Sequence, residues 1–147
     1  MSEILDSGNR REFESGAVRD MAKGKGRCDL LPLDVLCGDD LMLGYFAECQ
    51  KTLDYRTVEN TLWYFVIWYM RSSWEEILLE LSIHYEQGAE KYGENNWQKG
   101  LPKWCYLDSA IRHYLKWKRG DKDERHDRAV LWNLACLMWT IKHKEGE

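Results

Sequence analysis

The stretch "SWEEILLELSIHYEQGAEKYG", residues 73–93, decides the fold. Ser73 followed three residues later by Glu76 forms a capping box, a pairing that marks the start of a helix. Behind this cap, hydrophobic and small residues recur at helical spacing and define one inner face, namely Ile77, Leu81, His84, Tyr85, Gly88 and Tyr92. The stretch therefore predicts an amphipathic helix that ends at Tyr92–Gly93.

Helical patterns also occupy the chain on both sides of this stretch. We expect one helical block at about 33–50, and a second at about 55–70 that ends in the aromatic run "TLWYFVIWYM". After the polar loop that follows Gly93, Pro102 suits a first helical turn, and a further helix runs to about Arg119. Strand alternation and internal repeats do not stand out. The pattern predicts an all-α bundle of about four to five helices.

The last predicted helix carries a buried polar stripe. Asp121 with Glu124 forms another capping box, and the helix continues to about His143. Nearly every residue of "AVLWNLACLMWTI" (129–141) is apolar, which predicts that most of the helix circumference is buried. His126, Asn133 and Thr140 are spaced seven residues apart and therefore share one face. They form either a satisfied core network or one wall of a polar pocket.

Composition restricts the class of protein. The 147 residues are 44% hydrophobic and 31% charged, which predicts one soluble domain, with a basic arm (1–32), a helical segment (33–75) and core site helices (76–143). The net charge of −4 argues against binding of long nucleic acids. Apolar runs are too short to span a membrane, and the first residues contain no apolar signal core. The five cysteines have no Cys-x-x-Cys spacing, so we expect reduced thiols in a cytoplasmic protein.

Acidic residues near the polar stripe suggest a metal site. Within "GDKDERHD" (120–127), Asp121 and Glu124 fit helix-capping roles, which leaves Asp123 and His126 as the better ligand candidates. Glu80 flanks the buried face of the helix predicted for 73–93. Glu86 points away from that face, so it needs a partner helix or subunit on its side to become a ligand. Oxygen ligands from several helices suit Mg²⁺ or Mn²⁺.

Basic residues suggest a site for phosphates. The segment "SGAVRDMAKGKGRCDLLP" (15–32) combines glycines with the cations Arg19, Lys23, Lys25 and Arg27. Flexible backbone amides beside cations can enclose phosphate groups, although the segment also reads as a solvated basic arm and lacks the P-loop pattern. Arg112 either contacts phosphate or pairs with Asp108 one turn earlier. His113 lies on the side of its helix that also carries Ala110 and Trp117, so the pattern does not predict that it faces solvent.

Three segments together resemble a known family. They are 15–32, "HYEQGAEKYGENNWQKGLP" (84–102), and "SAIRHYLKW" with "GDKDERHDRAVLWN" (109–133). Their order and spacing resemble the phage-associated dATP/dGTP diphosphohydrolases, a branch of the MazG-like all-α nucleotide pyrophosphatases. The resemblance covers about half of the chain. It leaves out residues 37–75, which we interpret as an insertion that shapes the pocket or an oligomer interface.

The resemblance implies hydrolysis of a purine (deoxy)nucleoside triphosphate to the monophosphate and pyrophosphate, with bound Mg²⁺ or Mn²⁺. It implies metal binding or water activation by Glu80, Glu86, Asp123 and His126, with Glu86 and His126 as catalytic residues. Substrate contacts are implied for Lys91, Asn96, Trp97, Arg112, His113 and Asn133. Above the bound nucleotide, the arm would close with Arg19, Lys23, Lys25 and Arg27.

Two points stay open in the sequence. The wider superfamily uses a Glu-x-x-Asp pair, and here either Glu124 with Asp127 or Asp123 with His126 can take that place. The competing functions are a non-catalytic nucleotide-binding protein, an HD-type phosphohydrolase suggested by His113 and His126-Asp127, and a structural helical module. Eight tryptophans and eight tyrosines further predict a homo-oligomer, because one layer of helices does not readily bury them all.

Overall fold

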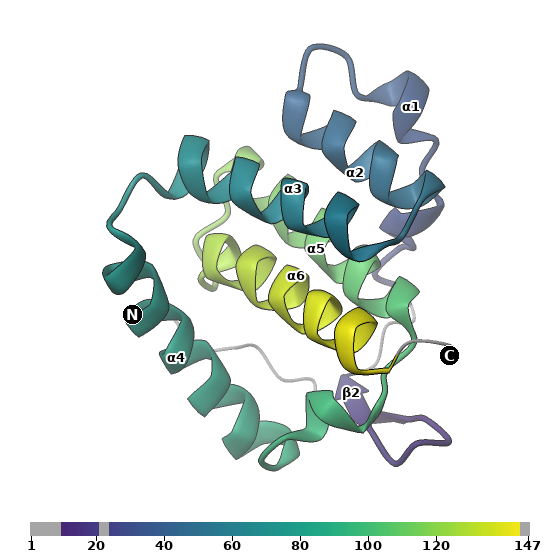
Figure 1. Cartoon of the computed structure of the whole chain (residues 1–147), viewed down its shortest axis with the longest axis vertical. Coiled ribbons are helices and arrows are strands. Elements are labelled where there is room, and N and C mark those ends of the chain that lie inside the picture. The colour runs from purple at the N-terminus through teal and green to yellow at the C-terminus, as the bar shows by residue number, and fades with distance from the viewer. Residues whose placement is uncertain (1–9, 21–23, 145–147) are drawn as a thin grey trace.

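Helices form most of the computed structural model, which describes residues 10–20 and 24–144 (Figure 1). The α-helices in this part of the chain are α1 (Leu33–Leu36), α2 (Leu41–Lys51), α3 (Tyr55–Phe65), α4 (Trp74–Tyr92), α5 (Lys103–Arg119) and α6 (His126–His143). Shorter turns are η1 (Cys28–Leu30), η2 (Val66–Met70) and η3 (Asn96–Lys99). The prediction of an all-α bundle is confirmed.

Helix α6 occupies the centre of the bundle. It packs against α3, α4 and α5, while α2 packs on α3 and α5 at the far side (Figure 1). Val130, Leu134 and Leu137 of α6 have no exposed surface, and Thr140 on another side of the same helix is also buried. The predicted burial of most of the α6 circumference is therefore confirmed. This central helix gives the site a rigid floor.

The Ser73 capping box marks the start of α4 correctly. Ser73 Oγ accepts a hydrogen bond from the backbone N–H of Glu76 (3.2 Å), as the capping box predicts for α4. The predicted block at 33–50 is interrupted before Asp40, whose side chain caps α2. The block at 55–70 changes from α-helix to a π-helical turn at Val66, and Arg71 ends it in a left-handed conformation (φ 52°).

The start of α6 differs from the prediction. Arg125 is the N-cap residue, and α6 begins at His126, so the capping box expected at Asp121 and Glu124 is wrong. Asp121 instead accepts two hydrogen bonds from Arg119, one from Nε to Oδ1 at 2.9 Å and one from Nη2 to Oδ2 at 2.5 Å. Glu124, the other residue of the expected capping box, lines a cavity.

A short antiparallel hairpin was not predicted. β1 (Arg10–Glu12) pairs with β2 (Val18–Asp20), with Arg11 opposite Arg19. Three residues per strand are too few for alternation to be visible in the sequence. The hairpin is held by η3, because the Asn96 amide accepts from Val18 N (2.8 Å) and donates to Val18 O (2.7 Å). The first segment of the resemblance thus lies beside the second.

The cysteines and the helix lengths agree with a simple helical domain. All five cysteines are free thiols in the structure. Within residues 10–20 and 24–144, no helix combines the length and the apolar character that crossing a bilayer requires.

Candidate functional site: a cationic pocket

A cavity of about 520 Å³ lies where β2, the end of α4, η3, α5 and α6 meet. Its basic lining residues are Arg11, Arg19, Lys25, Lys91, Arg112 and Lys116. Its aromatic side chains are Tyr85, Tyr92, Trp97 and Trp132. Among the described residues that line it, Glu124 is the sole carboxylate. The size suits a small organic ligand, and the charge balance favours an anionic one.

Arg19 is the central cation of the cavity. Strand β2 carries it across the bundle, where its NH2 group donates to Ser109 Oγ (3.1 Å) and Asn133 Oδ1 (2.6 Å). Its guanidinium carbon lies 5.3 Å from the Tyr106 ring and 5.7 Å from the Trp132 ring. These contacts fix the plane of the guanidinium. The buried Nη1 group has no hydrogen-bond partner among the described residues.

One face of α5 supplies a row of polar side chains to the cavity. Ser109, Arg112, His113 and Lys116 follow helical i, i+3, i+4, i+7 spacing and all line it. Arg112 makes the expected ion pair with Asp108 (2.7 Å) and also donates to the Gly26 carbonyl (2.6 Å). Its buried Nε has no partner. The structural and the functional interpretations of Arg112 are therefore compatible.

Aromatic rings form another part of the lining. The Tyr85 ring is 5.4 Å from that of Trp97 and 5.8 Å from that of Trp132, and Trp97 is supported from behind by Trp139 at 5.0 Å. The Trp132 indole N–H is buried without a partner. The cavity therefore combines flat apolar surfaces with unsatisfied donors, which is the combination needed for a ligand with a planar ring and an anionic tail.

Two histidines meet at one end of the cavity. His113 Nδ1 of α5 lies 2.9 Å from His126 Nδ1 of α6, and the Nε2 of His126 lies 2.6 Å from Asp123 Oδ1. Glu124 comes close to both rings, because single ligand atoms of Glu124, His113 and His126 all lie within 4.8 Å of one another. His126 is fully covered, so the cavity reaches it through His113 and Glu124.

Burial sets the protonation of this end of the cavity. Desolvation, with His126 as the next cause, holds the pKa of His113 well below its ordinary value. The hydrogen bond with His126 lowers the pKa of Asp123, which keeps that carboxylate ionised. Burial raises the pKa of Glu124. A cation near Glu124 would offset this desolvation and favour its ionised form.

A second buried network supports the α4 wall. Arg128 has only 1% of its surface exposed and reaches α4, where it donates to His84 Nδ1 (3.4 Å), Gln87 Oε1 (3.1 Å) and Glu80 Oε2 (3.4 Å). Burial lowers the pKa of His84 to about 3, so its ring is neutral where it lines the cavity. Sequence reasoning missed this role of Arg128, because nothing local marks an arginine as buried.

Most of the predicted substrate-contact residues come together. The cavity is lined by Arg19, Lys25, Lys91, Asn96, Trp97, Arg112, His113 and Asn133. The residues of the polar stripe on α6 have two different environments. Asn133 accepts from Arg19, whereas Thr140 donates to the Cys136 carbonyl (2.8 Å) and is satisfied within its own helix. His126 and Asn133 thus belong to the pocket side, and Thr140 belongs to the core network.

Several predicted site residues do not line the cavity. Glu86 is exposed on α4, and Glu80 forms ion pairs with Arg125 and Arg128. The predicted metal set of Glu80, Glu86, Asp123 and His126 is therefore not brought together. Arg27 lies outside the cavity, paired with Asp29.

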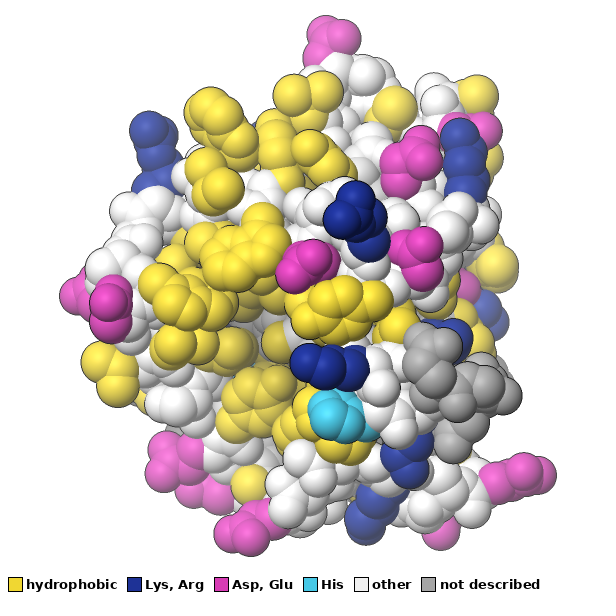
Figure 2. All heavy atoms as spheres, in the orientation of Figure 1, with side chains coloured by type: hydrophobic (Ala, Val, Ile, Leu, Met, Phe, Trp, Pro, Cys, Tyr) yellow, Lys and Arg dark blue, Asp and Glu magenta, His cyan; other side chains and the backbone are white. Residues whose placement is uncertain are grey.

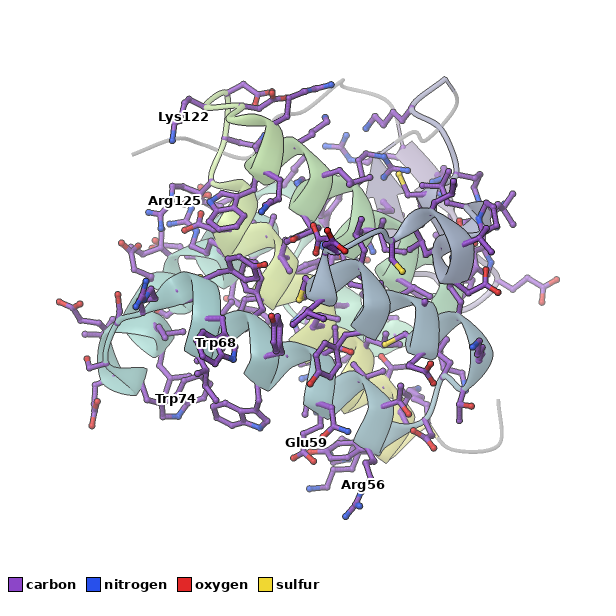
Figure 3. All side chains as sticks on the ribbon, turned by 90° about the horizontal axis from the view of Figure 1, so that it is seen from above. Arg56, Glu59, Trp68, Trp74, Lys122 and Arg125 are labelled. Carbon is purple, nitrogen blue, oxygen red and sulfur yellow. The ribbon has the colours of Figure 1, made fainter. Side chains whose placement is uncertain are left out.

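Asn96 lines the cavity, but its amide is used by Val18. Lys23 lies outside the described residues. The sequence left open whether Glu124 with Asp127 or Asp123 with His126 is the working pair. Asp127 forms an ion pair with Arg125 (3.1 Å), close to the α5–α6 loop (Figure 3). The structure therefore groups Glu124 of the first pair with His126 of the second and with His113, while Asp123 contacts His126 Nε2.

Sequence reasoning also missed several lining residues, including Arg11, Tyr85, Ser109, Lys116 and Trp132. A usable signal existed for Ser109 and Lys116, because they repeat at helical spacing with Arg112 and His113. The signal for Trp132 was its position next to Asn133 on a mostly buried helix. Arg11 could not be placed, since the hairpin that carries it was not predicted.

These features define an all-α protein with a cation-lined, aromatic-walled pocket. A family model described as "dATP/dGTP diphosphohydrolase, N-terminal" matches residues 68–147, more than half of the chain. The chain belongs to this family, whose description points to a nucleotide substrate. The matched range holds α4, η3, α5 and α6, and thus most of the pocket, while the hairpin and residues 15–32 lie before it. Comparison with curated proteins and with solved structures found no match.

Proposed function

We propose that the protein hydrolyses a purine deoxynucleoside triphosphate, dATP or dGTP, to the monophosphate and pyrophosphate. The observation that carries this proposal is the cavity with three buried N–H groups that lack partners, on Arg19, Arg112 and Trp132. A buried donor without a partner costs about 1–3 kcal/mol, so a ligand that accepts from it recovers that free energy. Phosphate oxygens are strong acceptors for guanidinium donors.

The arrangement of the cavity suggests how the nucleotide would lie. Arg19, Arg112 and Lys116 would bind the phosphates along the α5 face, each as a charge-assisted contact. The rings of Tyr85 and Trp97, from α4 and η3, would stack on the base. In this pose the α-phosphorus lies toward His113 and Glu124. Water would attack there, and the bond to the bridging oxygen would break as pyrophosphate leaves with that oxygen.

We expect the reaction to depend on a divalent cation, Mg²⁺ or Mn²⁺. The donor atoms near His126 suit Mn²⁺ better than Mg²⁺, because they include imidazole nitrogens. Glu124 and His113 both face the cavity, and Asp123 holds His126 from behind. A cation there would offset charge on the phosphates and lower the pKa of a bound water. Lys91 and Lys25 would add positive charge around the cavity.

A panel of nucleoside triphosphates incubated with Mn²⁺, with products separated by chromatography, tests the proposal. We expect dAMP or dGMP with equimolar pyrophosphate, faster turnover of purine than of pyrimidine substrates, and loss of activity with EDTA. Release of orthophosphate, as another phosphohydrolase chemistry would give, contradicts the proposal.

A second candidate function is binding without hydrolysis. It is favoured by the sparse acidity of the cavity, where Glu124 is the one carboxylate among the described lining residues. Calorimetric titration with dATP or dGTP separates the two functions. Tight binding of a nucleotide that is recovered intact, with or without Mn²⁺, would favour the sequestering function.

Self-association belongs to the same proposal. Exposed apolar side chains gather over the turn between α3 and α4, namely Trp63, Ile67, Trp68, Trp74, Leu78 and Leu79 (Figure 2). Two of these rings already stack, with the centroids of Trp63 and Trp74 4.9 Å apart. Clusters of this kind on a folded surface typically mark interfaces. A second copy of the chain, related by a twofold axis, would cover the surface with its own equivalent patch.

A further inference from the structure

The end of the cavity where α5 meets α6 has the composition of a transition-metal site. The Nδ1 atoms of His113 and His126 face each other at 2.9 Å, and a Glu124 carboxylate oxygen completes a group of ligand atoms that lie within 4.8 Å of one another. We propose that these three side chains bind one divalent transition-metal ion. Asp123 is then a positioning residue that acts through His126. This set differs from the carboxylate-based set that the sequence predicts.

The hydrogen bonds around His126 favour this assignment. The Asp123 carboxylate accepts from Nε2 of His126 (2.6 Å), which places the ring proton on Nε2 and leaves the Nδ1 lone pair directed at His113. A carboxylate behind a histidine is the arrangement that typically orients metal-binding imidazoles. Two nitrogens bound to one tetrahedral ion lie about 3.4 Å apart, so the rings need to separate by about 0.5 Å.

A competing cluster shares His126 but fits a metal less well. Asp121, Asp123 and His126 also place single ligand atoms within 4.8 Å of one another. Both Asp121 oxygens, however, are bound by Arg119, and Asp123 is largely exposed to solvent. This cluster would also use the Nε2 side of His126, away from His113. Glu124 and His113 instead line the cavity, where ligand positions of the ion would remain open to substrate.

The donor types predict which ions bind. Two imidazoles and one carboxylate suit Mn²⁺, Co²⁺ and Zn²⁺, whereas Mg²⁺ prefers oxygen ligands and retains its water. The inference deepens the proposed function, because an ion held by His113 and Glu124 would lie beside the proposed position of the α-phosphate. Metal binding itself is measured without nucleotide. Its outcome is therefore independent of whether the protein hydrolyses anything.

The test uses the untagged full chain, titrated with Co²⁺ and followed by visible absorption, with Zn²⁺ calorimetry in parallel. We expect one ion per chain and the absorption of a four- or five-coordinate Co²⁺ with nitrogen ligands. His113→Asn and Glu124→Gln should each weaken binding more than 100-fold. Asp123→Asn, which loses only the positioning contact, should weaken it about 10- to 100-fold.

Asp121→Asn is the matched control, since it removes a carboxylate of the competing cluster and should leave the affinity unchanged. Circular dichroism and the urea midpoint of each variant exclude loss of fold as the cause of weaker binding. Unchanged affinity in folded His113→Asn and Glu124→Gln overturns the site, as does loss of binding in Asp121→Asn alone. Equal affinity for Mg²⁺ and Mn²⁺ contradicts the imidazole ligands. Normal metal binding without triphosphate hydrolysis would instead reject the proposed function and leave the site intact.

Discussion

Arg19 connects three parts of the molecule that are distant in sequence. It belongs to β2, donates to Ser109 of α5 and Asn133 of α6, and keeps one buried N–H group without a partner. Such an arginine is held in place before any ligand arrives. The entropic cost of ordering it is therefore met by folding and not by binding.

Replacement of Arg19 by lysine tests its role as a phosphate contact. Lysine keeps the charge but loses the planar donor set, so the dissociation constant for the triphosphate should rise about tenfold to a hundredfold. Isothermal titration measures this change. Arg27→Lys is the control, because Arg27 pairs with Asp29 outside the cavity and its replacement should leave affinity unchanged. Equal affinities in both variants would remove Arg19 from the binding site.

His84 makes stability depend on pH. Folded His84 takes up a proton only near pH 3, whereas an ordinary histidine does so near 6.5, so the unfolded state binds more protons between these values. The free energy of unfolding should therefore fall as the pH is lowered from 7 to 5, by about 2 kcal/mol from this side chain. His113, whose pKa is also lowered, contributes in the same direction.

Urea unfolding at pH 5, 6 and 7 checks this prediction, with His84→Gln as the comparison. The variant should be less stable at pH 7 yet lose less stability on acidification than the parent chain. If both proteins show the same dependence on pH, His84 is not buried as a neutral ring. Thr140→Val, a change in the satisfied part of the α6 stripe, should leave the pH dependence as it is.

Sequence predicted the burial of individual residues better than it predicted their partners. The spacing of His126, Asn133 and Thr140 correctly placed all three on one face of a buried helix. It could not tell that Thr140 bonds to its own helix while Asn133 meets an arginine more than a hundred residues earlier. Glu86 already pointed outward on the helical wheel, and it is exposed in the structure.

Among the elements, η3 holds the hairpin in place. The Asn96 amide pairs with the backbone of Val18 as a neighbouring strand would: it accepts a hydrogen bond from Val18 N and donates one to Val18 O. Ser15 adds a third link, since its hydroxyl donates to the Gly100 carbonyl (2.9 Å). The position of Arg19 therefore depends on this contact between segments about 80 residues apart in the chain.

Asn96→Ala should loosen β2, because it removes the two hydrogen bonds between the Asn96 amide and Val18. Loss of the two bonds to Val18 should lower the free energy of unfolding by about 1–3 kcal/mol and weaken nucleotide binding, because Arg19 is less well positioned. Chemical denaturation and calorimetry measure the two effects. Lys99→Ala, an exposed change on the same turn, is the control. A fully stable Asn96→Ala variant with normal affinity would show that the hairpin does not depend on η3.

At this scale the sequence predicted the long helices and missed the short elements. Amphipathic spacing and the Ser73 cap located α4, and Gly120 correctly ended α5 with φ 95°. The β1–β2 hairpin and the π-helical η2 leave no periodic signal in the sequence, because both are too short. Each strand has three residues and η2 has five. Their conformation is set by tertiary contacts such as Asn96 with Val18.

For the whole molecule, the apolar surface over α3, η2 and α4 is the feature to test. In Figure 3 Trp68 and Trp74 project on the same side, away from the α5–α6 loop. If this surface joins two copies, Trp68→Lys should convert the oligomer to a monomer in light scattering with size exclusion. Leu36→Lys, at an exposed apolar residue on α1, should not. A monomeric parent chain would contradict self-association.

The pocket is a property of the assembled molecule, which limits how much of it sequence could predict. Its lining comes from both ends of the chain, and only the part from α4 to α6 lies within the matched family range. Local motifs supplied candidate residues such as Arg112 and His113. Which of the candidates meet is decided by the packing of α5 on α6, and that information is not local.

The most direct test of the proposed reaction is hydrolysis of dATP or dGTP with Mn²⁺ in ¹⁸O-labelled water, with products analysed by mass spectrometry. Attack at the α-phosphorus predicts one labelled oxygen in dAMP or dGMP and unlabelled pyrophosphate, formed in equal amounts. Recovery of intact triphosphate, or label in orthophosphate or pyrophosphate, would contradict the account.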